Sequence, residues 1–375
     1  MCSQPGLPLD LLSYKSALTD GVFLVIPGLL SPEAVDLKPV EAASIGRFLN
    51  WSEKTTVHSN GTTSGLESLI ARWFNAQAEA PDVVPIAVSN VVNNDETAAA
   101  RLGYRMEITS EGLPSAVYRV DPVYQQMDIN HATLADQSLL NLSPDDAATL
   151  IADLNAQFIS DGLKFESQHP LRWYCHFDKP LAINGVSLAD ATGRDVSLCR
   201  PTGEDARQWR SLLAEIEMIL YSHPVNRQRE ARGELPVNSL WIWGGGAIPE
   251  SRERSGSVYT NNFYARSYAD HCGIPVRDIT DFTADNQPAL LVDDRLATAA
   301  ATADVELRNR VIEELTPVVF AELNRSRSLL KKRVPVSLWC GGSNLWQLPE
   351  RIGIRNWLTG VGRPRAFESF VEPPR

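Results

Sequence analysis

The apolar positions of this chain form two patterns that alternate along its length. Short, mostly apolar runs occur at 22–26, 83–88, 289–292 and 334–340, and turn-forming or acidic residues bound them. Such runs are typical of strands that are buried on both faces of a sheet. Between the runs, apolar residues recur at intervals of three or four, which predicts amphipathic helices. The alternation predicts an α/β fold in which helices sandwich a mainly parallel sheet.

The helices are predicted from these spacings and from their end signals. A glycine follows the predicted helix at 264–272 and ends it, and Pro317 disturbs a long helix that begins at about 304. The other predicted helices lie at 41–49, at 64–74, from 143 onward, and over the stretch from Trp209 to Leu220.

The middle of the chain has a different predicted pattern of helices and strands from the two ends. Ser143, Pro144, Asp145 and Asp146 form a strong helix start, with a serine N-cap, a proline at the first helical position and acids in the first turn. The apolar face of this helix is predicted to pack on strands such as 172–177. We therefore predict that residues 121–235 form an inserted α+β cap, and that 1–120 and 236–375 form the α/β core.

Composition and charge narrow the class of protein. The chain has 375 residues, of which 43% are hydrophobic and 22% charged, so it is able to bury a core. A formal net charge of -11 and a pI of about 5.1 argue against a nucleic-acid-binding or anionic-membrane-binding surface. The five cysteines form no CxxC pair. Because the first 30 positions lack a secretory pattern and no apolar run approaches ~18 residues, we expect no membrane span and a cytoplasmic location.

The segment 223–246 has the highest density of residues with recognition chemistry. Arg227, Arg229 and Arg232 place three guanidinium groups within two helical turns, and arginine forks match phosphate and carboxylate oxygens. The other interpretation is an exposed helix end whose arginines pair with Glu230 and Glu234. Both interpretations stay open at this point.

Asparagines and glycines accompany these arginines. Asn226 and Asn238 are candidates to bind the same anion, or they close turns. Gly244 and Gly245 follow an aromatic strand, where backbone amides are able to approach a phosphate, although the run is neither a GxGxxG nor a Walker sequence. The predicted ligand-binding residues are therefore Asn226, Arg229, Arg232, Asn238, Gly244 and Gly245.

Other catalytic signals in the sequence are sparse. Asp293 and Asp294 end a predicted strand and are the candidate metal ligands, while the six histidines are scattered and form no HxxxH or HExxH pattern. Ser64 precedes a predicted helix, where the helix dipole favours a nucleophilic alkoxide. A plain N-cap serine is the alternative interpretation of Ser64.

A resemblance adds to these signals. The segment 223–246 reads HPVNRQREARGELPVNSLWIWGGG and resembles the signature of the bacterial RpfE-type regulatory protein family. The similarity extends over YRVDPVY, LNAQF, HPLRWY and EIEMIL. That family is similar in turn to the archaeal-type cofactor-independent phosphoglycerate mutases of the alkaline phosphatase superfamily. The resemblance implies an alkaline-phosphatase-like core with an inserted cap, and it does not by itself imply the activity.

The same resemblance marks positions where this chain departs from its metal-dependent relatives. Those relatives need an aspartate at the end of the first strand, a serine nucleophile, and later aspartate and histidine ligands for two divalent ions. Here Pro27 stands in place of the first aspartate, Ser64 matches the nucleophile loosely, no histidine follows Asp293 and Asp294, and Gly341 lies where the relatives show an aspartate-histidine pair. Two-metal chemistry depends on those charges.

Three functional hypotheses follow. The first is a catalytically degenerate, phosphoglycerate-mutase-like protein that acts in regulation by binding a phosphorylated small molecule or a partner protein, without a metal cofactor. The second is an active phosphomutase or phosphatase that uses Mn, Mg or Zn. The third is a pure protein-interaction module that uses the surfaces around Trp339, Trp346 and Trp357.

Overall fold

The computed structural model describes residues 21–30, 39–50, 52–56, 66, 70, 73–74, 99–108, 116–128, 131–245, 256–284, 288–326, 335–341 and 344–348. The chain divides into two compact units, one built from 1–85 and 251–375 and the other from 86–250. The strand predicted at 83–88, most of the helix predicted at 64–74, and Ser64 lie outside the described residues.

The first unit contains a seven-stranded sheet in the order β10-β9-β11-β1-β12-β13-β2. The five strands from β10 to β12 are parallel, and β13 and β2 join antiparallel at one edge. The strands are β1 (Val22–Val25), β2 (Glu53–Thr56), β9 (Ser257–Thr260), β10 (Val276–Arg277), β11 (Ala289–Val292), β12 (Val336–Trp339) and β13 (Asn344–Leu348).

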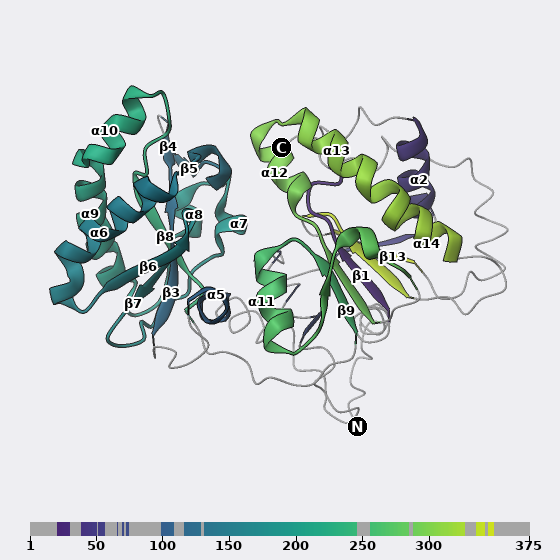
Figure 1. Cartoon of the computed structure of the whole chain (residues 1–375), viewed down its shortest axis with the longest axis horizontal. Helices are drawn as coiled ribbons and strands as arrows, with labels where there is room; N and C mark the ends of the chain where they lie inside the picture. The colour runs from purple at the N-terminus through teal and green to yellow at the C-terminus, as the bar shows by residue number, and fades with distance from the viewer. Residues whose placement is uncertain are drawn as a thin grey trace, which may run out of the picture. The chain divides into compact units, whose positions relative to one another are not determined.

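Helices flank this sheet, and the fold class predicted from the apolar runs is confirmed (Figure 1). They are α2 (Pro39–Asn50), α11 (Phe263–His271), α12 (Arg295–Thr302), α13 (Val305–Leu315) and α14 (Ala321–Ser326), with a 3-10 turn η6 (Ile279–Asp281). The helix predicted from about 304 changes to a π-helical turn, η7 (Thr316–Phe320), where Pro317 removes a backbone donor.

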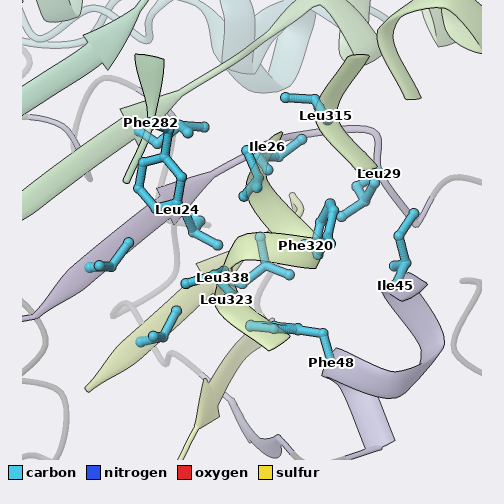
Figure 2. Close-up of a cluster of buried hydrophobic side chains, with 14 of the residues drawn as sticks. Leu24, Ile26, Leu29, Ile45, Phe48, Phe282, Leu315, Phe320, Leu323 and Leu338 are labelled. Carbon is cyan, nitrogen blue, oxygen red and sulfur yellow. The ribbon is translucent and has the colours of Figure 1, made fainter. Parts of the chain in front are cut away.

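Both faces of the central strands are buried. β1 is fully buried along its length, and on one face Leu24 and Ile26 pack with Leu338 against Phe48 of α2 and Phe320 of η7 (Figure 2). Helix α11 packs against β9 and contributes no residue to this cluster, so it covers the other face. Continuous apolar strands are the expected result of burial on both sides.

The second unit contains a four-stranded antiparallel sheet in the order β6-β7-β3-β8. Its strands are β3 (Val117–Val123), β6 (Lys164–His169), β7 (Arg172–His176) and β8 (Ser239–Trp243), and a separate ribbon pairs β4 (Gln125–Met127) with β5 (Ala132–Leu134). Its helices are α5 (Ala99–Glu107), α6 (Pro144–Phe158), α7 (Leu188–Ala191), α8 (Val196–Cys199), α9 (Ala206–Ser222) and α10 (Pro224–Ala231), with the 3-10 turns η4 (Gln137–Leu140) and η5 (Ile159–Asp161).

The predicted helix start at Ser143 is present in this unit. The Ser143 hydroxyl accepts a hydrogen bond from the Asp146 backbone N–H at 3.1 Å, and Pro144 occupies the first turn of α6. Leu150 and Leu154 of α6 pack with Ile216 of α9 in the core over the sheet. The amphipathic spacing of both helices therefore predicted their buried faces correctly.

The chain passes from one unit to the other at different positions from those that the sequence pattern predicted. The predicted boundaries lie after 120 and after 235, whereas the units divide after 85 and after 250. The physical reason is the pairing of β3 with β8, in which Arg119 lies opposite Trp243 and Val123 opposite Ser239. That pairing places both strands in the inserted sheet, although each lies partly or wholly beyond the predicted limits. None of the helices in the described part of the chain is long and apolar enough to cross a membrane.

Candidate functional site

The carboxyl ends of the parallel strands bring several of the predicted site residues to one edge of the first sheet. The Ile26 N–H donates to the Trp339 carbonyl at 2.8 Å, and the Asp293 N–H donates to the Val25 carbonyl at 3.0 Å. Because β1, β11 and β12 run parallel in register, Pro27, Asp293 and Gly341 follow at the same edge. We call this group, together with Asn262 and Asp294, the carboxyl edge. It is where α/β folds place their ligands.

Asp293 is fully buried at this edge and forms an ion pair with Arg295, two residues further along the chain. The Arg295 guanidinium donates to both oxygens of Asp293, at 2.9 Å from Nε to Oδ1 and 2.6 Å from Nη2 to Oδ2. The other side of the same guanidinium donates to Glu314 of α13, at 3.0 Å from Nη1 to Oε2. Hydrogen bonds to Asp293 and Glu314 raise the pKa of the guanidinium. Asp293 is thus neutralised by a cation of the protein itself.

Asp294, the second candidate ligand, is held by neighbouring strand ends. Its Oδ2 accepts a hydrogen bond from the Asn262 side-chain amide at 2.7 Å. Asn262 is fixed in turn, because its backbone N–H donates to the Thr260 hydroxyl at 2.9 Å and its Oδ1 caps α11. Burial raises the pKa of the Asp294 carboxyl, with a further contribution from the negative charge of Asp293. Asp294 is therefore a half-buried acid that accepts a hydrogen bond from an amide.

The donor set at the described carboxyl edge does not fit a divalent ion. A catalytic metal needs several carboxylate or imidazole ligands that converge on one point and are free of other cations. Both oxygens of Asp293 bind Arg295 instead, and within the described ranges no group of three histidine, cysteine, aspartate or glutamate side chains is arranged to hold a metal.

The turn after β1 lies directly against the helix that follows Asp294. Gly28 has φ +86, and a Cβ at this position would lie 2.7 Å from the backbone carbonyl of Leu296 in α12. The Gly28 N–H donates to the Cys340 carbonyl at 2.9 Å, which ties this turn to the end of β12. Only glycine fits here, because both the backbone angle and the close approach exclude a side chain.

The segment predicted to bind an anion forms α10 and the return to β8. The His223 ring begins the helix, since its Nδ1 accepts a hydrogen bond from the Val225 N–H and its Nε2 lies 2.9 Å from Asp153. The Asn226 side chain then joins the two ends of the segment. Its amide nitrogen donates to the carbonyls of Leu220 and Val237 at 2.7 Å, and its oxygen accepts from the Val237 N–H at 2.9 Å.

Arg229 and Arg232 bind acids of the same unit. Arg229 has no exposed surface; its Nε donates to the Leu235 carbonyl at 3.1 Å, and its Nη2 donates to the Leu140 carbonyl. Its Nη1 donates to Asp146 at 3.1 Å. Arg232, whose side chain is 46% exposed, also contacts Asp146 at 3.1 Å and binds Glu234 at 2.9 Å. The Glu234 partner matches one of the two interpretations of the sequence.

The remaining predicted ligand residues hold the backbone. Asn238 exchanges two hydrogen bonds with the main chain of Gln125, at 2.7 and 2.9 Å. Gly244 adopts φ +75, and a Cβ on Gly245 would lie 1.8 Å from Cε1 of Tyr118. The special backbone at these glycines therefore serves a close contact with an aromatic ring.

Arg295 and Glu314 are the site residues that the sequence interpretation missed. Arg295 follows the two aspartates directly, so the DDR order was a visible signal that a cation stands beside the candidate ligands. Glu314 is nineteen positions further on, and only the packing of α13 beside α12 brings it to Arg295. Sequence spacing carries no sign of that contact.

Curated sequences show which known proteins this chain is similar to. No protein-family model matches the chain. The 2,3-bisphosphoglycerate-independent phosphoglycerate mutase of Methanosarcina mazei is 26% identical over 209 residues, which is 52% of this chain and 51% of that protein. The Methanosarcina acetivorans protein of the same name is 25% identical over 248 residues, 61% of each chain. The chain is distantly similar to these mutases.

The probable mutase of Geobacter sulfurreducens is 35% identical over 142 residues, which cover 37% of this chain and 35% of that protein. The chain thus spans less than two thirds of the length of these curated relatives. The resemblance to the RpfE-type family stays a prediction.

Two solved structures are similar at low identity. They are a cofactor-independent phosphoglycerate mutase from Thermoplasma acidophilum, with 15% identity, a TM-score of 0.37 and coverage of 88% of this chain and 89% of that one, and the PH0037 protein from Pyrococcus horikoshii, with 12% identity, a TM-score of 0.42 and coverage of 95% and 99%. The fold described above rests on the observed strand order and pairing.

Proposed function

We propose that this chain is a phosphoglycerate-mutase-like protein that has lost two-metal phosphoryl transfer and acts in regulation, through binding of a metabolite or of a partner protein. The ion pair between Asp293 and Arg295 carries the proposal. A guanidinium that binds both carboxylate oxygens occupies the positions through which Asp293 would bind a metal.

Glu314 supports the proposal because it fixes the guanidinium from the other side. Release of Asp293 for a metal would break the hydrogen bonds that Arg295 donates to both of its oxygens, while Glu314 holds the guanidinium in place. It would also leave the Arg295 cation beside the incoming metal cation, which is unfavourable in a partly buried site. Pro27 and Gly341 add no ligand at the positions where the resemblance expects aspartate or histidine.

The competing function is an active mutase or phosphatase, which the names of the curated relatives favour. That function requires ligands from outside the described residues, together with Ser64 as the nucleophile. It also requires that Arg295 leaves Asp293.

Metal content and turnover of the full chain test the proposal. We expect less than one equivalent of Mn, Mg or Zn after purification, and no interconversion of 3- and 2-phosphoglycerate by NMR when each metal is added. Turnover that disappears in both Ser64→Ala and Asp293→Asn, but not in the control Asp281→Asn, would overturn the proposal. The control removes an acid that is close in sequence and forms no part of the carboxyl edge.

Ligand-binding measurements distinguish regulation by a metabolite from regulation by a partner protein. A phosphorylated three-carbon acid that raises the thermal unfolding temperature supports a metabolite, and Arg232→Gln tests the exposed member of the predicted anion segment. An unfolding temperature that stays constant across a panel of phosphorylated metabolites supports a partner protein.

A further inference from the structure

Helix α9 of the second unit presents three different kinds of side chain along one face. Arg210, Leu213 and Glu217 are separated by three and four positions, so they lie in line on the same side of the helix. All three line a pocket of about 240 Å³ that α9 forms with β8 and with residues 196–201. Along the helix, this wall of the pocket is therefore first cationic, then apolar and then anionic.

The chain itself packs against β8 here, so the strand does not supply the polar groups of the pocket. Gly185 lies against the Ile242 carbonyl, where a Cβ would approach the oxygen to 2.7 Å, and the Trp241 indole N–H donates to the Val186 carbonyl at 2.8 Å. Leu240, Trp241 and Ile242 line the pocket but are at most 4% exposed. Recognition of a ligand therefore depends on the polar side chains around them.

Two guanidinium groups form the cationic end of the pocket. Arg200 and Arg210 both line it and both are exposed. Among the described residues neither side chain forms a hydrogen bond or an ion pair, whereas Arg229, Arg232 and Arg295 each bind carboxylates of the chain. Arginine binds a planar carboxylate through two parallel hydrogen bonds. This end is therefore able to bind an acid group of a ligand.

Hydrogen-bond acceptors form the other end of the pocket. The Ser239 hydroxyl donates to Oε1 of Glu217 at 2.6 Å and accepts from the Gln125 side-chain amide at 2.8 Å. A hydroxyl has one hydrogen, so Gln125 meets Ser239 through its NH2 group and keeps its amide oxygen as an acceptor. Glu217 and Gln125 both line the pocket, and in the described part of the chain Oε2 of Glu217 accepts no hydrogen bond. An ammonium group, which only donates, matches this end.

The separation of the two ends sets the length of the ligand. Arg210 and Glu217 are two helical turns apart, or about 10 Å along the axis. The ammonium and carboxylate groups of an α-amino acid share one carbon and lie about 3 Å apart, so they do not reach both ends. Five methylene groups separate the two charges by about 7 Å, and hydrogen bonds of about 3 Å complete the distance. Leu213 lies between the ends and provides an apolar contact for the methylenes.

We propose that this pocket binds a linear ω-amino carboxylate, a zwitterion whose two charges are joined by an unbranched aliphatic chain. Its carboxylate binds Arg200 and Arg210, and its ammonium group binds Glu217. Each charge of the ligand then meets the opposite charge of the protein. The pocket of about 240 Å³ is smaller than the ~300–1,000 Å³ that drug-sized ligands occupy, and an unbranched chain of this length is correspondingly small.

This inference is independent of the proposed loss of phosphoryl transfer. Binding at α9 holds whether or not the carboxyl edge turns over a phosphate ester, and the two are measured by different assays. A failure of ω-amino acid binding therefore leaves the result on metal and turnover unchanged.

Calorimetry with ε-aminocaproate and the full chain tests the proposal. We expect saturable binding that weakens about tenfold or more in Arg210→Gln, since hydrogen bonds to a charged group are lost. Arg207→Gln is the matched control, because Arg207 is an exposed arginine of α9 that does not line the pocket, and this variant should bind as the parent does. Equal losses in the two variants, or no binding at millimolar ε-aminocaproate, would overturn the proposal.

An isomer of the same ligand tests the length argument. Norleucine has the same atoms as ε-aminocaproate, but both of its charges lie at one end of the carbon chain. It should bind about tenfold more weakly or not at all, because it leaves either Glu217 or the arginines without a partner. Equal affinity for the two isomers contradicts the assignment of separate ends.

Ligands with a single charge test each end separately. Glu217→Gln removes the charge but keeps an oxygen that accepts from the Ser239 hydroxyl, so it should weaken binding of ε-aminocaproate and leave binding of caproate unchanged. Arg210→Gln should weaken both. Glu215→Gln, an exposed acid of α9 outside this pocket, is the control and should change neither. Caproate that binds the parent as tightly as ε-aminocaproate, or that loses affinity in Glu217→Gln, refutes the role of Glu217.

Discussion

Arg229 and Arg232 bind the same two carboxylates, and they provide a direct test of whether the basic segment is structural. Arg229→Ala removes a side chain with no exposed surface and leaves the carbonyls of Leu140 and Leu235 without their donor. An unsatisfied buried carbonyl costs about 1–3 kcal/mol. Removal of one partner from a buried pair costs about 3–5 kcal/mol. We expect Arg229→Ala to lower the free energy of unfolding of the second unit by about 3–5 kcal/mol.

Arg232→Ala is the control for this experiment. Its guanidinium contacts Asp146 and Glu234 as Arg229 does, but it is 46% exposed and donates to no buried carbonyl. Exposed pairs contribute little to stability, so the unfolding curve should stay close to that of the parent chain. Urea denaturation measures both variants, and hydrogen exchange of the β3 and β8 amides reports on the second unit separately. Equal effects of the two substitutions would refute the assignment of Arg229 as a structural clamp.

Three further predictions concern packing and pH. Gly245→Ala should destabilise the chain by at least about 2 kcal/mol, because the new Cβ would lie 1.8 Å from the Tyr118 ring. Gly233→Ala places its Cβ in open space and should cost only about 1–2 kcal/mol, for its φ of +77. Urea denaturation compares the stability of the two variants. Burial raises the pKa of Asp294 above its value in the unfolded chain, so ionisation of this carboxyl opposes folding at neutral pH. Asp294→Asn should therefore raise the melting temperature at pH 7, and this gain should shrink as the pH falls below the raised pKa. Burial also raises the pKa of Asp190 to about 6. The free energy of unfolding should therefore fall as the pH rises toward 6 and level off above it. Carboxyl NMR should show the Asp190 titration near pH 6, and a midpoint near 4 contradicts the prediction.

The fold was predictable from the sequence where local patterns and burial agree. Continuous apolar runs such as 22–25 indicated central parallel strands, and the capping residues Ser143 and Pro144 indicated the start of α6. The division into units was less accessible. β3 and β8 are far apart in sequence and pair antiparallel, and no local signal shows that they share a sheet.

The candidate site was predicted in part. Parallel strands place Pro27, Asp293 and Gly341 at one edge, as expected from strand direction alone. The partners of each side chain depend on three-dimensional packing, so neither the bond from Arg295 to Glu314 nor the burial of Arg229 was visible in the spacing.

The order of strands in the first sheet has a consequence for how the chain folds during synthesis. β1 emerges early from the ribosome, but its two neighbours are β11 at 289–292 and β12 at 336–339. Until those residues are made, an apolar strand has no sheet to join and is exposed to aggregation. The inserted unit is continuous from 86 to 250 and is complete well before that point. The second unit should therefore fold first, and the first unit should close only after most of the chain has been synthesised.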